Sequence, residues 1–217
     1  MVSKLLAKNT GQCHSMPLLF LILAEELETE AFWCFSPSHS FIKFQDKQNR
    51  WYNIELTQGA VVTDNFYMNS GFIKSKAIQT GIYLNPRTMK QTIAHMLNDL
   101  SAYYISRYGY DHFIEENSNL VLRYSPSDLT AYQHYANICT VQAQYVIDAC
   151  GRPPKEQLPE YPQAHRLFKK MLQSYEKIDS LGYEEMPAEI YHNWLKQVDK
   201  AKTLPENQPS PIIQIKK

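Results

Sequence analysis

The sequence predicts an α+β fold, in which an N-terminal buried helix packs on an antiparallel sheet and α-helical hairpins follow. Two observations support this prediction. One strongly apolar helical segment precedes three runs that are rich in aromatic and β-branched residues. From Thr88 onwards, apolar residues recur at intervals of three and four, which is the period of an α-helix.

The first helix is expected over Cys13 to Leu27. Its apolar residues surround the helix almost completely, which indicates a helix buried in the core. Thr10 and Gly11 supply N-cap chemistry, and Pro17 is tolerated only near the first turn, so the helix should begin close to Gln12 or a few residues later.

Three strands should follow, over Ala31 to Phe35, His39 to Gln45 and Trp51 to Thr57, with the sequence DKQN forming a hairpin loop between the second and third. The stretch from Gly59 to Arg87 has no clear periodicity. We expect it to be an irregular excursion with short helices.

The C-terminal half is predicted to be a string of antiparallel helix pairs. The final stretch, LPENQPSPIIQIKK, is rich in proline and predicts a flexible tail, in which IIQI could add an edge strand. The predicted helices span Met89 to Tyr108, Asp111 to Tyr124, Pro126 to Cys150, Pro162 to Leu181 and Pro187 to Lys202.

Composition limits the possible partners. The chain has 22 Lys and Arg residues against 22 Asp and Glu residues, so no net charge favours nucleic acid or an anionic membrane. The apolar run from Pro17 to Ala24 is too short to span a bilayer. The 4 cysteines lack the spacing of a disulfide framework, and we expect mostly free thiols in a soluble protein, with the cytoplasm favoured.

Cys13 is the candidate nucleophile, because a helix N-terminus stabilises a thiolate through its unpaired amides. A nucleophilic thiol also needs an imidazole to carry its proton and an acceptor to orient that imidazole. His39 and Glu55 are the candidates for these roles. Side chains alternate faces along a strand, so an odd hairpin loop places His39 opposite Glu55, or opposite Thr57 with Glu55 one diagonal step away.

An even loop would separate the two residues onto opposite faces. Asn53 has the same parity as Glu55 and is a second possible orienting residue for His39, because an amide can also hold a histidine tautomer.

The order of these residues resembles the transglutaminase-like branch of papain-type cysteine enzymes. The matching pieces are GQCHSMPLLFLILAEEL, SPSHSFIKF and WYNIELTQG, which lie within residues 8 to 60. The helices after Thr88 loosely resemble those of bacterial proteins that join such a domain to tetratricopeptide-like helices. The resemblance implies a transglutaminase-like domain over residues 1–87, a tetratricopeptide-like region over 88–203 and a flexible tail over 204–217.

By this resemblance Cys13 would be the nucleophile, His39 the general base and acid, and Glu55 the orienting acid. The family usually has Asp where this chain has Glu55, and its members commonly carry more sequence before the nucleophile, so we expect further sequence upstream. Gln12 and the Cys13 amide are the candidates for stabilising the oxyanion.

Two functions of different classes remain open. The first is thiol-dependent acyl transfer on an amide or peptide, more readily hydrolysis than crosslinking. The second is a catalytically inactive scaffold whose helical tail binds a peptide or protein partner. A zinc site built from Cys13, His14, Cys34 and His39 is disfavoured, because adjacent residues cannot both point inward from one helical turn. No cofactor and no metal is predicted, and the histidines at positions 95, 112, 134, 165 and 192 receive no role.

Overall fold

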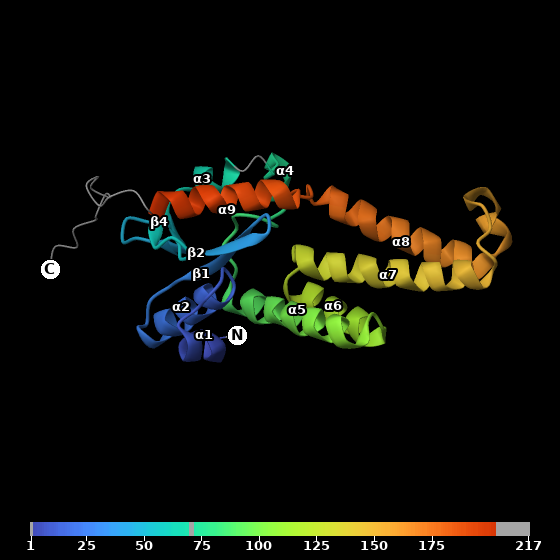
Figure 1. The fold of residues 1–217 in the computed structure, drawn as a ribbon, viewed down its shortest axis with the longest axis horizontal. Coiled ribbons are helices and arrows are strands. Elements are labelled where there is room, and N and C mark those ends of the chain that lie inside the picture. Colours follow the sequence, from blue (N-terminus) through green and yellow to red (C-terminus); the bar gives the residue numbers. More distant parts are fainter. Residues whose placement is uncertain (1, 70–71, 203–217) are drawn as a thin grey trace.

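The computed structural model describes residues 2–69 and 72–202 of the chain. A four-stranded sheet and its flanking helices form one end of the molecule, and a stack of long helices extends from it (Figure 1). The elements in order are α1 (Val2–Lys8), α2 (Ser15–Glu26), β1 (Phe32–Ser36), β2 (His39–Gln45), β3 (Trp51–Glu55), β4 (Ala60–Val62), α3 (Asp64–Met68), α4 (Ser75–Gln79), α5 (Met89–Tyr108), α6 (His112–Tyr124), α7 (Leu129–Ala149), a 3-10 helix (Lys155–Glu160), α8 (Pro162–Ser180) and α9 (Ala188–Lys202).

The sheet is antiparallel with strand order β1-β2-β3-β4, which confirms the predicted antiparallel sheet. The predicted strands agree with β1, β2 and β3 to within two residues at each end. Strand β4 pairs with β3 and was not predicted, because three residues are too few to show an alternating pattern. The stretch after β4 contains the short helices α3 and α4, as expected.

The two faces of the sheet are covered by different helices. Trp33 and Ile42 point to one face and pack against Leu18 and Leu21 of α2. Cys34 and Phe41 point to the other face, where they pack with Tyr67 of α3 and other buried residues. Figure 1 accordingly shows α1 and α2 on one side of the sheet and α3, α4 and α9 on the other.

The expectation of a fully buried first helix is wrong. Helix α2 buries one face against the sheet, but Ile22 and Leu23 on the opposite face are 48% and 52% exposed. A helix that lies on a single layer can bury only the side facing that layer. The helix begins at Ser15, a few residues after Gln12 as predicted, but its N-cap is His14 rather than Thr10 or Gly11. The Ser15 hydroxyl accepts a hydrogen bond from the Gln12 backbone N–H (3.0 Å).

Helices α5, α6 and α7 each begin directly after a residue whose side chain caps the helix. Thr88 caps α5 through a capping box with Gln91, and Asp111 and Asp128 accept backbone N–H groups at the starts of α6 and α7. Asp128 therefore replaces the expected start of the third helix near Pro126. Helices α5, α6, α7 and α8 pack as successive neighbours.

Helix α9 leaves this stack and returns to the sheet. In Figure 1 it runs beside α3 and α4, although the predicted division assigns it to the helical region 88–203. Trp194 of α9 packs against the core cluster that includes Phe41 and Tyr67. The predicted tail over residues 204–217, with its possible edge strand, lies outside the described residues. Within the described residues, no helix combines the length and the apolar character needed to cross a membrane.

Candidate active site

Cys13 lies in the turn that leads into α2. The hydroxyl of Ser40 on β2 donates a hydrogen bond to the Cys13 carbonyl oxygen, and the Gln12 backbone carbonyl accepts from the N–H of Met16 (3.1 Å). The turn is therefore fastened both to the sheet and to the first turn of the helix. Cys13 is half-buried, and all four cysteines of the chain are free thiols, as predicted.

His39 and Glu55 meet across the sheet. His39 Nε2 lies 2.7 Å from Glu55 Oε2, and both side chains are almost completely buried. The loop of residues 46–50 has an odd length, and Lys43 pairs with Asn53. Continuing this register places His39 opposite Thr57, with Glu55 one diagonal step away. This is the second of the two pairings that an odd loop allows.

Glu55 is held as an anion by several donors. Its Oε1 accepts hydrogen bonds from the backbone N–H (3.0 Å) and hydroxyl of Thr57, and its Oε2 accepts from the Tyr67 hydroxyl (3.1 Å). Burial alone would raise the pKa of Glu55, but hydrogen bonds from His39 and Thr57 and the charge of His39 lower it. A carboxylate in this state accepts a proton-bearing nitrogen and so fixes the orientation of the His39 ring.

The other ring nitrogen of His39, Nδ1, does not bind Glu55. Nδ1 is buried and makes no hydrogen bond within the described part of the chain. Burial alone would lower the pKa of His39, but its interactions with the Cys13 and Glu55 side chains raise it to about 9. Because Nε2 faces Glu55, Nδ1 is the nitrogen that remains to exchange a proton with Cys13 Sγ.

Aromatic rings enclose the imidazole. Tyr67 lies roughly parallel to the His39 ring, with 6.3 Å between the ring centroids. Trp194 of α9 meets the same ring edge-on at 5.0 Å, and Tyr191 stacks on Trp194. These rings exclude water from His39, which strengthens its interaction with Glu55. Sequence analysis missed them, because nothing in the pattern of α9 shows which surface that helix covers.

Asn53 does not orient His39. Its amide Nδ2 donates to Asp64 (2.8 Å), and the same carboxylate binds the ammonium group of Lys43 (2.9 Å). Asn53 and Lys43 stand directly opposite each other, so Asp64 at the start of α3 bridges both. Glu55 is therefore the orienting residue that the structure brings to His39.

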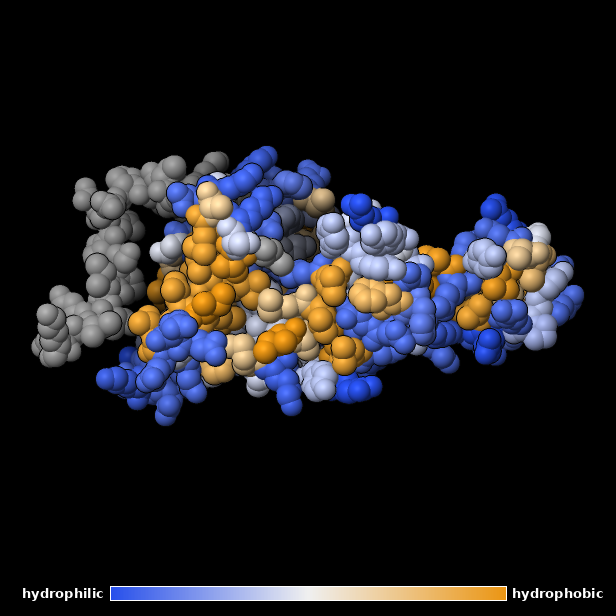
Figure 2. Space-filling model, turned by 90° about the horizontal axis from the view of Figure 1, so that it is seen from below, coloured by the Kyte–Doolittle hydropathy of each residue, from blue (hydrophilic) through white to orange (hydrophobic). Residues whose placement is uncertain are grey.

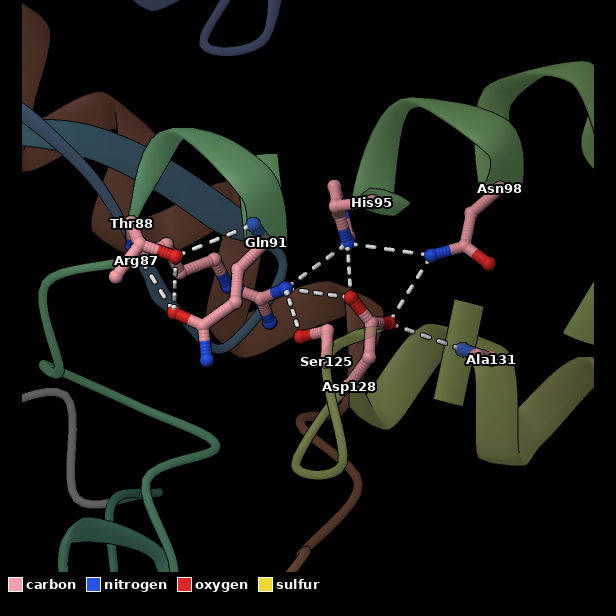
Figure 3. A network of polar contacts seen from close by, with 8 residues as sticks. All are labelled: Arg87, Thr88, Gln91, His95, Asn98, Ser125, Asp128 and Ala131. Carbon is pink, nitrogen blue, oxygen red and sulfur yellow. Dashed lines mark hydrogen bonds and ion pairs between the residues drawn. The ribbon is translucent and has the colours of Figure 1, made fainter. Parts of the chain in front are cut away.

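A second buried cluster lies beside the first and was not predicted. Figure 3 shows Asp128 at its centre, where its carboxylate accepts from Arg87, from His95 Nδ1 (2.7 Å) and from Asn98 Nδ2 (3.0 Å). Burial alone would raise the pKa of Asp128, but these cationic and hydrogen-bonding neighbours hold it far below its ordinary value. Burial lowers the pKa of His95, so its imidazole is neutral at pH 7.

His14 connects this cluster to the turn that holds Cys13. The ring centroids of His14 and His95 lie 6.0 Å apart, and the two rings pack around Phe35 and Trp33 of β1. His14 Nδ1 also lies 3.6 Å from Asp99 on α5. The helical half of the chain thus contacts the residue next to Cys13. Sequence analysis gave no sign of these contacts of His95, because neither residue spacing nor periodicity reveals a contact between segments so distant in sequence.

A pocket of about 260 Å³ separates the two clusters. It opens where the β1-β2 hairpin meets α5 and α7, and its wall is mostly polar. His39 lines one side and His95 the other. The remaining lining residues are His14, Phe35, Ser36, Ser38, Ile82, Tyr83, Arg87, Leu129, Thr130, Gln133 and Tyr183. A polar substrate group could therefore lie beside His39 without displacing α9.

The four residues considered for zinc do not converge. Cys34 lies buried in the core opposite Phe41 of β2, and burial raises its pKa to about 12. Among the described residues, no group of three or more His, Cys, Asp or Glu side chains has an arrangement suited to a metal ion.

Comparison of the chain with protein-family models, with curated proteins and with solved structures found no match. The site is therefore interpreted from its own geometry.

Proposed function

We propose that this chain is a thiol-dependent acyl-transfer enzyme that hydrolyses an amide or peptide through Cys13, His39 and Glu55. The observation that supports this proposal is the position of one imidazole, which is bound by a buried carboxylate and has its pKa raised by the Cys13 side chain. Glu55 binds Nε2 at 2.7 Å, while the Cys13 thiol interacts with the same ring and contributes to a pKa of about 9. The transglutaminase-like resemblance of residues 1–87 is part of the same proposal.

The chemistry follows from these positions. Cys13 Sγ attacks the substrate carbonyl carbon after passing its proton to His39 Nδ1, and the imidazolium then protonates the leaving amine. A thioester to Cys13 remains. His39 next removes a proton from water, which attacks the thioester and releases the acid. Glu55 stays ionised throughout and holds the ring in the orientation that both steps require.

The negative charge on the substrate oxygen needs a donor close to Cys13. The backbone N–H of Gln12 is already bound to Ser15 Oγ. The Cys13 backbone N–H and the exposed Gln12 side chain therefore remain as the candidate donors.

The second candidate function is a non-catalytic scaffold. The observation that favours it is the cover over His39, whose side chain is only 1% exposed beneath Trp194. A scaffold would keep the Cys13–His39–Glu55 arrangement as a structural contact without reacting. The two functions make opposite predictions for the reactivity of Cys13.

The deciding experiment measures the rate at which iodoacetamide alkylates each cysteine between pH 5 and pH 9, read by peptide mass spectrometry. An enzyme predicts that Cys13 reacts fastest at pH values where ordinary thiols are protonated, and that His39→Ala removes this advantage. Cys34 is an internal control, because its buried thiol should stay unreactive. His112→Ala is the matched control, since His112 is 78% exposed and distant in the fold.

Equal rates for Cys13 in the wild type and in His39→Ala would contradict the enzymatic proposal and favour the scaffold. If Cys13 has the predicted reactivity, amide and peptide libraries can be screened for turnover by the wild type, with Cys13→Ala as the inactive reference.

A further inference from the structure

Helix α5 places its polar residues inside and its apolar residues outside. The buried positions of α5 include His95, Asn98 and Ser101. On the opposite side, five large apolar side chains are between 42% and 64% exposed, and we name them the α5 stripe: Met89, Ile93, Met96, Leu100 and Tyr103. An ordinary surface helix has the reverse arrangement.

The orientation of α5 is fixed by its polar contacts. Asn98 and His95 bind Asp128, and the Asn117 amide of α6 donates to Ser101 Oγ (2.6 Å) and to the Leu97 carbonyl (2.8 Å). Rotating the helix to bury the stripe would break these bonds and leave several polar groups unpaired in the interior. The stripe is therefore a stable feature of the folded chain.

The spacing of the stripe indicates what covers it. Its residues stand at positions 89, 93, 96, 100 and 103, so the intervals alternate between four and three. This is the pattern of a coiled-coil seam, into which a second helix inserts its own apolar side chains. Charge does not oppose such a contact. Lys90 lies over the Tyr124 ring at 5.5 Å, and Asp99 faces His14 at 3.6 Å. Arg107, at the next position of the same pattern, lies over the Tyr108 ring at 5.9 Å. These three charges therefore have partners in their own chain.

The apolar surface continues onto α2. A groove of about 260 Å³ joins the two helices, with Leu21 and Ala24 on one wall and Met89 on the other. Beyond it, Ile22, Leu23 and Leu27 are between 48% and 75% exposed. Figure 2, which views the molecule from below, shows apolar side chains gathered over this side of the molecule.

The size of this surface matches one half of a protein interface. Half-exposed large side chains of about 200 Å² each give a patch on the order of 800 Å², counting the stripe and the three residues of α2. The largest apolar patch of a typical monomer is about 300–600 Å². A standard interface buries about 800 Å² on each partner.

We propose that this surface, the α5 stripe together with the exposed apolar residues of α2, binds the same surface of a second copy of this chain, with the two stripes packed against each other. Reversing the helix changes the intervals from 4-3-4-3 to 3-4-3-4, so the alternation is kept, and two stripes related by a two-fold axis can interlock in antiparallel orientation. This surface lies away from the pocket beside His39, and the proposal is independent of the proposed function.

The test is the mass of the full chain in solution, measured by sedimentation equilibrium from low to high micromolar concentration. The wild type should form dimers. Ile93→Glu places a charge within the stripe of both subunits and should raise the dissociation constant by at least about 100-fold. Tyr145→Glu is the control, because Tyr145 is 77% exposed on α7, and its dimer should be unchanged.

Circular dichroism of each variant verifies that the fold is kept. A wild type that stays monomeric over the whole range would overturn the proposal, and would leave a helix of another protein as the occupant. Dimers of undiminished affinity in Ile93→Glu would overturn it equally.

Discussion

The raised pKa of His39 makes the stability of the protein depend on pH in a window that can be calculated. In the unfolded chain the imidazole has its ordinary pKa of 6.5, whereas in the folded chain the value is about 9. The folded state therefore binds a proton that the unfolded state has already lost in this range. The stabilisation is fully present below pH 6.5 and is lost as the pH rises through 9.

The magnitude follows from the two values. A pKa difference of about 2.5, at about 1.36 kcal/mol for each pKa unit, corresponds to about 3 kcal/mol of unfolding free energy. The assay is urea unfolding of the wild type and of His39→Gln at a series of pH values from 6 to 10. The difference between the two proteins isolates His39 from other groups that titrate in this range.

The wild type should lose about 3 kcal/mol relative to His39→Gln across this window. His112→Gln, which changes an exposed histidine, should follow the wild type. A wild-type curve parallel to that of His39→Gln would refute the reasoning, because the imidazole would then carry no extra proton in the folded state.

Three further predictions concern the two clusters and their cover. Glu55→Gln should lower any acyl-transfer rate by at least about 100-fold while circular dichroism stays unchanged, because the His39 ring loses its charged acceptor; full activity would remove Glu55 from the mechanism. Trp194→Ala should increase the alkylation rate of Cys13 roughly two- to tenfold, since one edge-on aromatic contact with His39 is lost. His192→Ala, on the same helix, is the control. Equal alkylation rates in Trp194→Ala and the wild type would show that α9 does not limit access to Cys13. Asp128→Asn should cost about 3 kcal/mol in urea unfolding, because it removes the charge from a buried ion pair, and a loss below 1 kcal/mol would contradict the importance of this cluster.

Local patterns predicted much of the fold. Aromatic and β-branched content indicated β1, β2 and β3, and intervals of three and four indicated α5 to α9. Parity was sufficient to place His39 and Glu55 on one face, because the side-chain period of a strand is fixed at two and the loop between them is odd. These inferences succeeded because each depends on neighbours along the chain or across one hairpin.

The features that escaped prediction depend on contacts between distant segments. The periodicity of α5 shows an apolar side, and that side would ordinarily be assigned to the core. The structure buries the other side, where His95 and Asn98 of α5 bind the Asp128 carboxylate at the start of α7, together with Arg87. In the same way, the pattern of α9 indicates a helix but does not show that Trp194 covers His39.

The order in which the site is completed has a consequence for synthesis. Cys13, His39 and Glu55 all leave the ribosome early, whereas Trp194 is made much later. At roughly 5–20 residues per second, the interval between Glu55 and Trp194 lasts on the order of ten seconds. During that interval a nascent chain can bring the thiol and the imidazole together without the Trp194 ring, so oxidants and electrophiles can reach this cysteine more readily on the unfinished protein.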